Sequence, residues 1–113
     1  MKRGDIYLGR FPMAGKGGVK LRPVLMLTDP VGPVPEVLAA YISGSIPPSL
    51  LPSDILLDAS QPEFASTNLA QISVLRLHKL STLHQRDFVR RLGELSPAVM
   101  KQVEALLRTL LKL

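Results

Sequence analysis

A short buried strand at residues 23–27 sets the first limit on the fold of this chain. The segment reads Pro-Val-Leu-Met-Leu, and a short continuous apolar run fits a strand that is covered on both faces. Pro23 has no backbone N–H to donate to a sheet, so we expect it at the first residue of the strand. Arg22 would then lie just outside the core, at the mouth of the sheet, where its guanidinium presents a flat fork of donors.

A glycine-rich, basic loop leads into Arg22. Residues 14–20 read Ala-Gly-Lys-Gly-Gly-Val-Lys, and glycine generally marks turns and loops. A fixed cation beside a flexible cationic loop suits a phosphate ligand, with Lys16 and Lys20 as further contacts. The alternative is an ordinary hairpin with solvated lysines, and this segment alone leaves both interpretations open.

The first two thirds of the chain predicts short strands separated by turns. Residues 29–35 contain three prolines, which exclude a helix or a central strand there. We expect further strands at residues 6–11, 37–42, 54–58 and 69–77, with loops at 47–53 and 60–67. In the last of these strands Ala70, Ile72 and Val74 would share one face.

The last third predicts two helices instead. Residues 82–85, Thr-Leu-His-Gln, fit a capping box at a helix start. Phe88 and Leu92 then fall four residues apart, and Gly93 stands where a helix would end.

A second helix is expected from Ser96 onward. Ser96 is a preferred N-cap residue, and Pro97 is favoured at the first helical position. An apolar stripe then runs along the helix to the end of the chain, formed by Val99, Val103, Leu106, Leu107, Leu110 and Leu111. The two helices follow five or more short strands with short connections. This order predicts one α+β domain over residues 1–113, a small, partly closed antiparallel β-barrel with C-terminal helices.

Charge and composition limit the classes of partner and chemistry. The net charge of +5 favours a polyanion such as nucleic acid, although solubility alone could account for it. The absence of cysteine removes disulfides and thiolate chemistry and fits a cytoplasmic protein. No apolar run approaches the roughly 18 residues that span a bilayer. His78 and His84 have no partners at ligand spacing, so we expect no metal site and no cofactor.

Arg22 and Ser43 are the strongest candidates for a site. In an antiparallel pair the start of one strand lies beside the end of its neighbour, so Arg22, Ser43, Ser45 and the glycine loop should share one rim. For the two serines, the alternative is ordinary turn chemistry around Gly44.

Four segments together resemble the MazF/PemK-like toxins of type II toxin–antitoxin systems. Residues 3–7, Arg-Gly-Asp-Ile-Tyr, with the glycine-rich loop and residues 20–27, are similar to the amino-terminal signature of this family. Residues 39–45 resemble its next motif, in which a strand ends in Thr or Ser. Residues 69–80 resemble a later strand with Arg76 at a recurrent basic position, and the helix after Ser96 resembles the closing helix.

The resemblance implies an SH3-like barrel that forms a homodimer and is neutralised by an acidic, partly disordered antitoxin. It also implies a sequence-specific, metal-independent endoribonuclease that cleaves single-stranded mRNA. The ribose 2′-hydroxyl would attack its own phosphate, leaving a 2′,3′-cyclic phosphate and a 5′-hydroxyl. By position, the catalytic residues are Arg22 and Ser43. The RNA-binding residues implied are Lys16, Lys20, Ser45, Gln71, Ser73 and Arg76.

The chain departs from the family pattern in two places. Many members carry a glutamate in the first loop, where this chain has Gly17, and some carry Arg and Asp where it has Gln71 and Ser73. No carboxylate base is therefore evident. The alternative function is a non-catalytic barrel of the same fold that binds RNA or inhibits a protein target such as gyrase.

Overall fold

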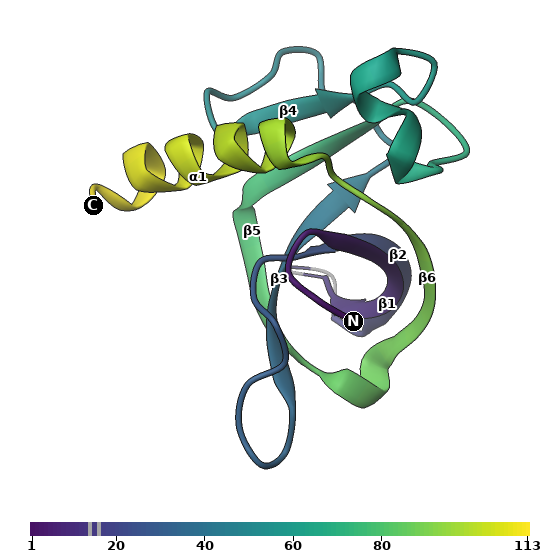
Figure 1. Cartoon of the computed structure of the whole chain (residues 1–113), viewed down its shortest axis with the longest axis vertical. Helices are drawn as coiled ribbons and strands as arrows, with labels where there is room; N and C mark the ends of the chain where they lie inside the picture. The colour runs from purple at the N-terminus through teal and green to yellow at the C-terminus, as the bar shows by residue number, and fades with distance from the viewer. Residues whose placement is uncertain (14, 16) are drawn as a thin grey trace.

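An antiparallel sheet and one C-terminal helix form the part of the chain that the computed structural model describes, residues 1–13, 15 and 17–113 (Figure 1). The six-stranded sheet has the order β4-β5-β3-β2-β1-β6, and each neighbouring pair is antiparallel. The strands are β1 (Asp5–Pro12), β2 (Val19–Met26), β3 (Glu36–Ser43), β4 (Asp54–Leu57), β5 (Ser73–His84) and β6 (Phe88–Glu94), and the helix is α1 (Pro97–Leu111). Two short 3-10 turns are η1 (Pro62–Thr67) and η2 (Gln85–Asp87).

The sheet is strongly curved. In Figure 1, β1 and β2 lie near the centre of the view, and β6 curves around them on one side with β3 and β5 on the other. Register shifts interrupt the β1–β6 and β3–β5 ladders, and such bulges bend a strand and increase its twist. Over the described residues β4 and β6 remain the two edges of the sheet and do not pair with each other, so the sheet is open.

The prediction of two C-terminal helices is wrong at the first of them. Residues 82–84 complete strand β5, and residues 88–94 form β6. The capping signal produces only the turn η2, at whose start the His84 ring accepts a hydrogen bond from the Arg86 backbone N–H. Gly93 does not end a helix: an added Cβ would lie 2.2 Å from the Ser66 carbonyl oxygen. Its small size therefore lets β6 pass against η1.

Two further strand boundaries differ from expectation. Strand β2 begins at Val19, so Pro23 lies inside it, opposite Leu8 of β1. The β2–β3 ladder begins only at Val24, and Pro23 therefore lies just outside that ladder. Strand β5 begins at Ser73, and Ile72 is 47% exposed rather than sharing a buried face with Val74.

The expected strands at residues 6–11, 37–42 and 54–58 are confirmed by β1, β3 and β4. The second predicted helix is also confirmed: Ser96 caps α1 by accepting a hydrogen bond from the Val99 backbone N–H, and Pro97 is its first residue. Where a loop was expected at residues 60–67, the structure has the short turn η1.

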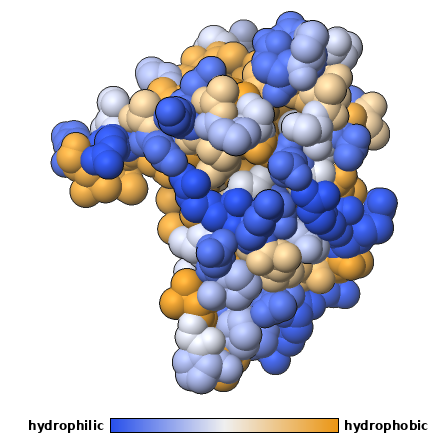
Figure 2. Space-filling view, in the orientation of Figure 1, coloured by the Kyte–Doolittle hydropathy of each residue, from blue (hydrophilic) through white to orange (hydrophobic). Residues whose placement is uncertain are grey.

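Two apolar clusters lie on opposite faces of the sheet. The larger one joins the sheet to the first half of α1 through Val99, Met100 and Val103. The smaller one is built around Phe11 and Tyr41, whose ring centroids are 5.3 Å apart. The second half of α1 extends beyond the sheet, and Figure 2 shows apolar surface along this projecting end. No helix in the described part of the chain is long and apolar enough to cross a membrane.

Candidate active site

A pocket of about 400 Å³ opens where β2 begins its pairing with β3 and where β3 ends. We call it the Arg22 pocket. It takes residues from β2, from the end of β3 and from the segment that precedes β5. Its lining consists of Leu21, Arg22, Pro23, Tyr41, Ser43, Gly44, Ser45, Leu69, Ala70, Gln71 and Ser73. Its size is within the range of about 300–1,000 Å³ that is usual for ligand sites.

The sheet register brings Arg22 and Ser43 together. Val24 pairs with Tyr41 in the antiparallel β2–β3 ladder. Arg22 precedes Val24 by two residues and Ser43 follows Tyr41 by two, so all four side chains share one face. The structure thus joins the two predicted catalytic residues in one pocket, whereas the described residues of the glycine loop do not line it.

The Arg22 guanidinium is half-buried and has no carboxylate partner among the described residues. Within the described part of the chain, its one hydrogen bond runs from Nη1 to the carbonyl oxygen of Leu21, 2.9 Å away. The remaining donors of the fork are therefore available to an anion. Among the described residues, no other charged side chain lines this pocket.

The Ser43 hydroxyl takes part in a turn. It accepts a hydrogen bond from the Ser45 backbone N–H at 3.1 Å and donates one to the Ser45 carbonyl oxygen at 3.3 Å. The turn chemistry that the sequence left open is therefore present. It also fixes the Ser43 oxygen in the wall of the pocket, since this side chain is buried.

Gln71 and Ser73 complete the opposite wall. The Gln71 side chain lies across Gly44 so closely that an added Cβ there would be 2.1 Å from its Nε2. Ser73 is buried, and its hydroxyl donates to the Gln71 carbonyl oxygen at 3.0 Å. The lack of a side chain at Gly44 therefore decides how far the Gln71 amide reaches over the pocket.

Of the basic residues predicted to bind RNA, Lys20 and Arg76 do not share one site. Lys20 is exposed on β2 and shares a face with Arg22, but it does not line the pocket. Arg76 lies outside the pocket, and Asp54 binds it through two contacts of 3.1 Å, to Nε and Nη2. Its guanidinium therefore already has a buried acidic partner. Lys16 is outside the described residues.

Tyr41 is a lining residue that the sequence analysis did not select. It belongs to an almost wholly apolar strand and is 6% exposed, so composition marks it as core. Its position two residues before Ser43 was the available signal, because side chains two apart on a strand share a face.

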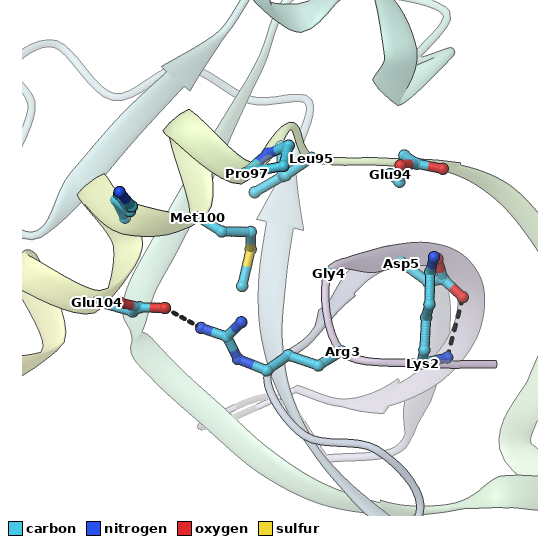
Figure 3. Close-up of a pocket in the computed structure, with 10 residues that line it drawn as sticks. Lys2, Arg3, Gly4, Asp5, Glu94, Leu95, Pro97, Met100 and Glu104 are labelled. Carbon is cyan, nitrogen blue, oxygen red and sulfur yellow. Dashed lines mark hydrogen bonds and ion pairs between the residues drawn. The ribbon is translucent and has the colours of Figure 1, made fainter.

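A different pocket, of about 330 Å³, lies between the start of β1 and α1 (Figure 3). Arg3 forms an ion pair with Glu104 across it, and the Lys2 backbone N–H donates to Asp5. Asp5 also bonds to Arg91. The pKa of the Arg91 guanidinium is raised, first by its hydrogen bond to Asp5 and second by the one to Glu94. Cations and carboxylates line this pocket in equal number, so it offers a polyanion no net attraction, unlike the Arg22 pocket.

The Arg22 pocket combines one cation with neutral donors and has no base on its walls. Hydroxyl and amide groups surround the guanidinium, and among the residues described neither a carboxylate nor an imidazole lines the cavity. No cluster of three or more metal-ligating side chains occurs in the described part of the chain. The arrangement suits recognition of a phosphate by charge-assisted hydrogen bonds.

Comparison with known proteins identifies relatives over the whole chain. The family described as "PemK-like, MazF-like toxin of type II toxin-antitoxin system" matches residues 2–111. "Endoribonuclease MazF6" of Mycobacterium tuberculosis (strain ATCC 25618 / H37Rv) is 30% identical over 117 residues, covering 100% of this chain and 98% of that protein. "Endoribonuclease MazF2" of Mycobacterium bovis has the same identity and coverage.

Solved structures agree with this fold. The "Mycobacterium tuberculosis toxin MazF-mt6" superposes with a TM-score of 0.74 at 22% identity, covering 96% of this chain and 97% of that one. An "Endoribonuclease in complex with its cognate antitoxin from Mycobacterial species" superposes with a TM-score of 0.67 at 21% identity, covering 100% and 96%. At such identities the structural likeness establishes a shared fold.

Proposed function

The chain belongs to the PemK-like, MazF-like toxins of type II toxin–antitoxin systems, and from this membership we propose that it is an endoribonuclease that cuts single-stranded RNA in the Arg22 pocket. The observation that supports the site is the Arg22 guanidinium, which has no carboxylate partner among the described residues and lies in a pocket whose other polar groups are neutral. A toxin of this kind acts on mRNA and is neutralised by its cognate antitoxin.

The proposed reaction is an attack of the ribose 2′-hydroxyl oxygen on the adjacent phosphorus. The O2′–P bond forms as the P–O5′ bond breaks, the 2′-hydroxyl proton leaves to solvent, and the departing 5′-oxygen gains a proton. The products are a 2′,3′-cyclic phosphate and a 5′-hydroxyl. Arg22 would stabilise the negative charge that develops on the phosphate oxygens, and it serves poorly as a base because it stays protonated.

Ser43 would position the phosphate beside Arg22. Its oxygen is fixed by the Ser45 turn. It can accept one further hydrogen bond there, or donate its proton to the phosphate in place of the Ser45 carbonyl oxygen. Gln71 and Ser45 would contact the neighbouring nucleotide, and Lys16 and Lys20 would neutralise phosphates farther along the strand. The proposal needs no metal, because the charge that a metal would neutralise falls to the Arg22 guanidinium.

A non-catalytic barrel that binds RNA or poisons a protein target would have no need of a free guanidinium beside Ser43. The endoribonuclease relatives at 30% identity also favour the enzyme. We further propose that the curved, open sheet is an SH3-like barrel in one domain and that the protein acts in the cytoplasm, where mRNA and antitoxin are made.

The proposed assembly is a homodimer. A mostly apolar pocket of about 450 Å³ lies between the β3–β4 connection and the second half of α1, where it is lined by Leu51, Pro52, Leu106 and Leu110. Leu51 and Leu110 are 43% and 37% exposed. A second copy of the chain would cover this surface, since a twofold axis lets the same patch bury itself. An acidic antitoxin segment would then occupy the basic rim, the surface around Arg22 and Lys20, and exclude RNA.

The deciding experiment incubates end-labelled single-stranded RNA with purified protein in excess EDTA. We expect cleavage, fragments that end in a 2′,3′-cyclic phosphate, and no cleavage by an Arg22→Ala control that remains folded. Activity that disappears with EDTA and returns with added magnesium or zinc would contradict the proposed mechanism. Intact RNA under all conditions would contradict the enzyme itself.

A further inference from the structure

A pocket of about 500 Å³ adjoins the Arg22 pocket and shares Tyr41 with it. We call it the bulge pocket. Apart from Tyr41, it takes its residues from the end of β1, from the residue that follows it, and from the middle of β5. Its lining consists of Phe11, Pro12, Met13, Tyr41, His78, Lys79, Leu80 and Ser81. The two pockets therefore lie on either side of one buried tyrosine.

The bulge pocket owes its shape to a break in the β3–β5 ladder. Ala40 of β3 pairs with Leu80, whereas the next residue, Tyr41, pairs with Arg76. Residues 77–79 of β5 consequently have no partner on β3. Leu77 turns into the main core, whereas His78 and Lys79 are exposed at the rim. A bulge of this kind leaves backbone donors and acceptors outside the ladder, where they are available to a ligand.

The lining suits a flat, partly apolar ligand with negative charge beside it. Phe11 and Tyr41 form a buried aromatic floor, and Met13 packs against the same cluster. The Lys79 ammonium lies 5.5 Å from the centre of the Tyr41 ring, and no carboxylate within the described residues forms an ion pair with it. An apolar floor with a few polar groups at the rim is the usual make-up of a specific ligand pocket.

We propose that the bulge pocket binds the base of a nucleotide next to the one whose phosphate is cut. The inference rests on the proposed function, since the phosphate at Arg22 places the rest of the strand. The base would lie against Phe11, Tyr41 and Met13, Lys79 would bind the adjoining phosphate, and the backbone of His78 and Lys79 would contact the base edge. Bulge-pocket contacts would thus help to set the sequence that is cut, because base edges in single strands are read by such groups.

The test uses 2′-O-methyl RNA oligonucleotides, which lack the attacking hydroxyl and so remain intact. Each carries the fluorescent base 2-aminopurine at one position around the most rapidly cut site. We expect one position beside the cut to show a fluorescence change on binding. Met13→Ala should reduce that change, and Lys79→Gln should weaken binding roughly five- to tenfold. Lys101→Gln, which removes an exposed lysine from α1 and does not line the bulge pocket, is the matched control and should do neither.

An equal response at every position, or variants that behave like Lys101→Gln, would overturn the bulge pocket as a base site. This binding test can fail or succeed separately from the test of cleavage. If the wild-type protein cuts no RNA, the proposed function fails, and the same titrations in an oligouridine host still test the pocket. A dimer that covers the pocket would likewise appear as no position-specific change.

Discussion

At the scale of single residues, Arg22 is the position where charge and geometry can be separated. Replacing it with lysine retains the charge but loses the planar fork that can hold two phosphate oxygens. Loss of one such transition-state donor typically lowers the rate by roughly 10²–10³. We expect Arg22→Lys to lose about that much single-turnover cleavage while RNA affinity changes only a few-fold.

Ser43→Ala is the companion variant and should lose less, because a neutral hydroxyl is partly replaced by water. Both variants should remain folded in a thermal melt, since Arg22 is half-buried at the pocket and Ser43 closes only a local turn. An Arg22→Lys protein that cuts at nearly the wild-type rate would reduce Arg22 to a docking residue.

Gly93 tests packing rather than chemistry. A Cβ at this position would lie 2.2 Å from the Ser66 carbonyl oxygen and 2.6 Å from that of Thr67, and neither backbone group can move without shifting η1. Overpacking of this kind costs about 1–3 kcal/mol or more, so Gly93→Ala should lower the free energy of unfolding by at least that amount. The control is Gly18→Ala, where the backbone is left-handed but an added Cβ would have no atom of the described residues within 4 Å, chain neighbours aside. A smaller loss at Gly93 than at Gly18, measured by urea unfolding, would contradict this account.

The sequence sufficed to predict some residues of the Arg22 pocket and not others. Arg22 and Ser43 could be paired because antiparallel register places a strand start beside a strand end. Tyr41 could not be recognised, since an aromatic residue in an apolar strand has the composition of core whether or not one edge faces a pocket. The Asp54 partner of Arg76 comes from 22 positions away on another strand, and nothing local to Arg76 indicates it.

At the scale of elements, β5 and β6 show why the predicted helix failed. The capping signal at residues 82–85 was local, and it does start the turn η2. Phe88 and Leu92 four residues apart fit either element over so short a segment. Tertiary pairing makes residues 88–94 a strand, because β6 adds to the free edge of β1. By contrast, α1 was predictable, since its cap, its first proline and its long apolar stripe all agree.

The projecting half of α1 gives the prediction for assembly. Burying a leucine is worth about 1.5–3 kcal/mol, and a twofold interface counts each side chain twice. Leu110→Glu should therefore raise the dimer dissociation constant by at least roughly 100-fold and shift sedimentation toward the monomer. Lys101 is on the same helix but lines the pocket between the start of β1 and α1, so Lys101→Glu should leave the dimer intact. A wild-type protein that sediments as a monomer at micromolar concentration would remove the dimer.

At the scale of the whole molecule, the net charge of +5 predicts a strong dependence of RNA binding on salt. Each phosphate neutralised on a single strand contributes a slope of about −0.7 in a plot of log affinity against log salt. If Arg22, Lys20 and Lys79 each bind a phosphate, the slope should be near −2, and Lys20→Gln should make it shallower by about 0.7. Fluorescence titrations from low to high salt measure this. A slope near zero would mean that RNA does not follow the basic rim.

The pairing of β1 with β6 links the order of synthesis to the order of folding. Asp5 pairs with Glu94, and Ile6 shares its core cluster with Leu95 and Val99. The contact between β1 and β6 closes a long loop, and it can form only after β6 has been made. The residues of the proposed cutting site emerge from the ribosome early, yet the sheet behind them stays incomplete until β6 has been made. Nascent chains arrested before residue 88 should therefore cut no RNA when assayed on the ribosome, whereas released chains should. A chain whose sheet is completed only by β6 is thus expected to leave the message that encodes it uncut while the codons before residue 88 are being read.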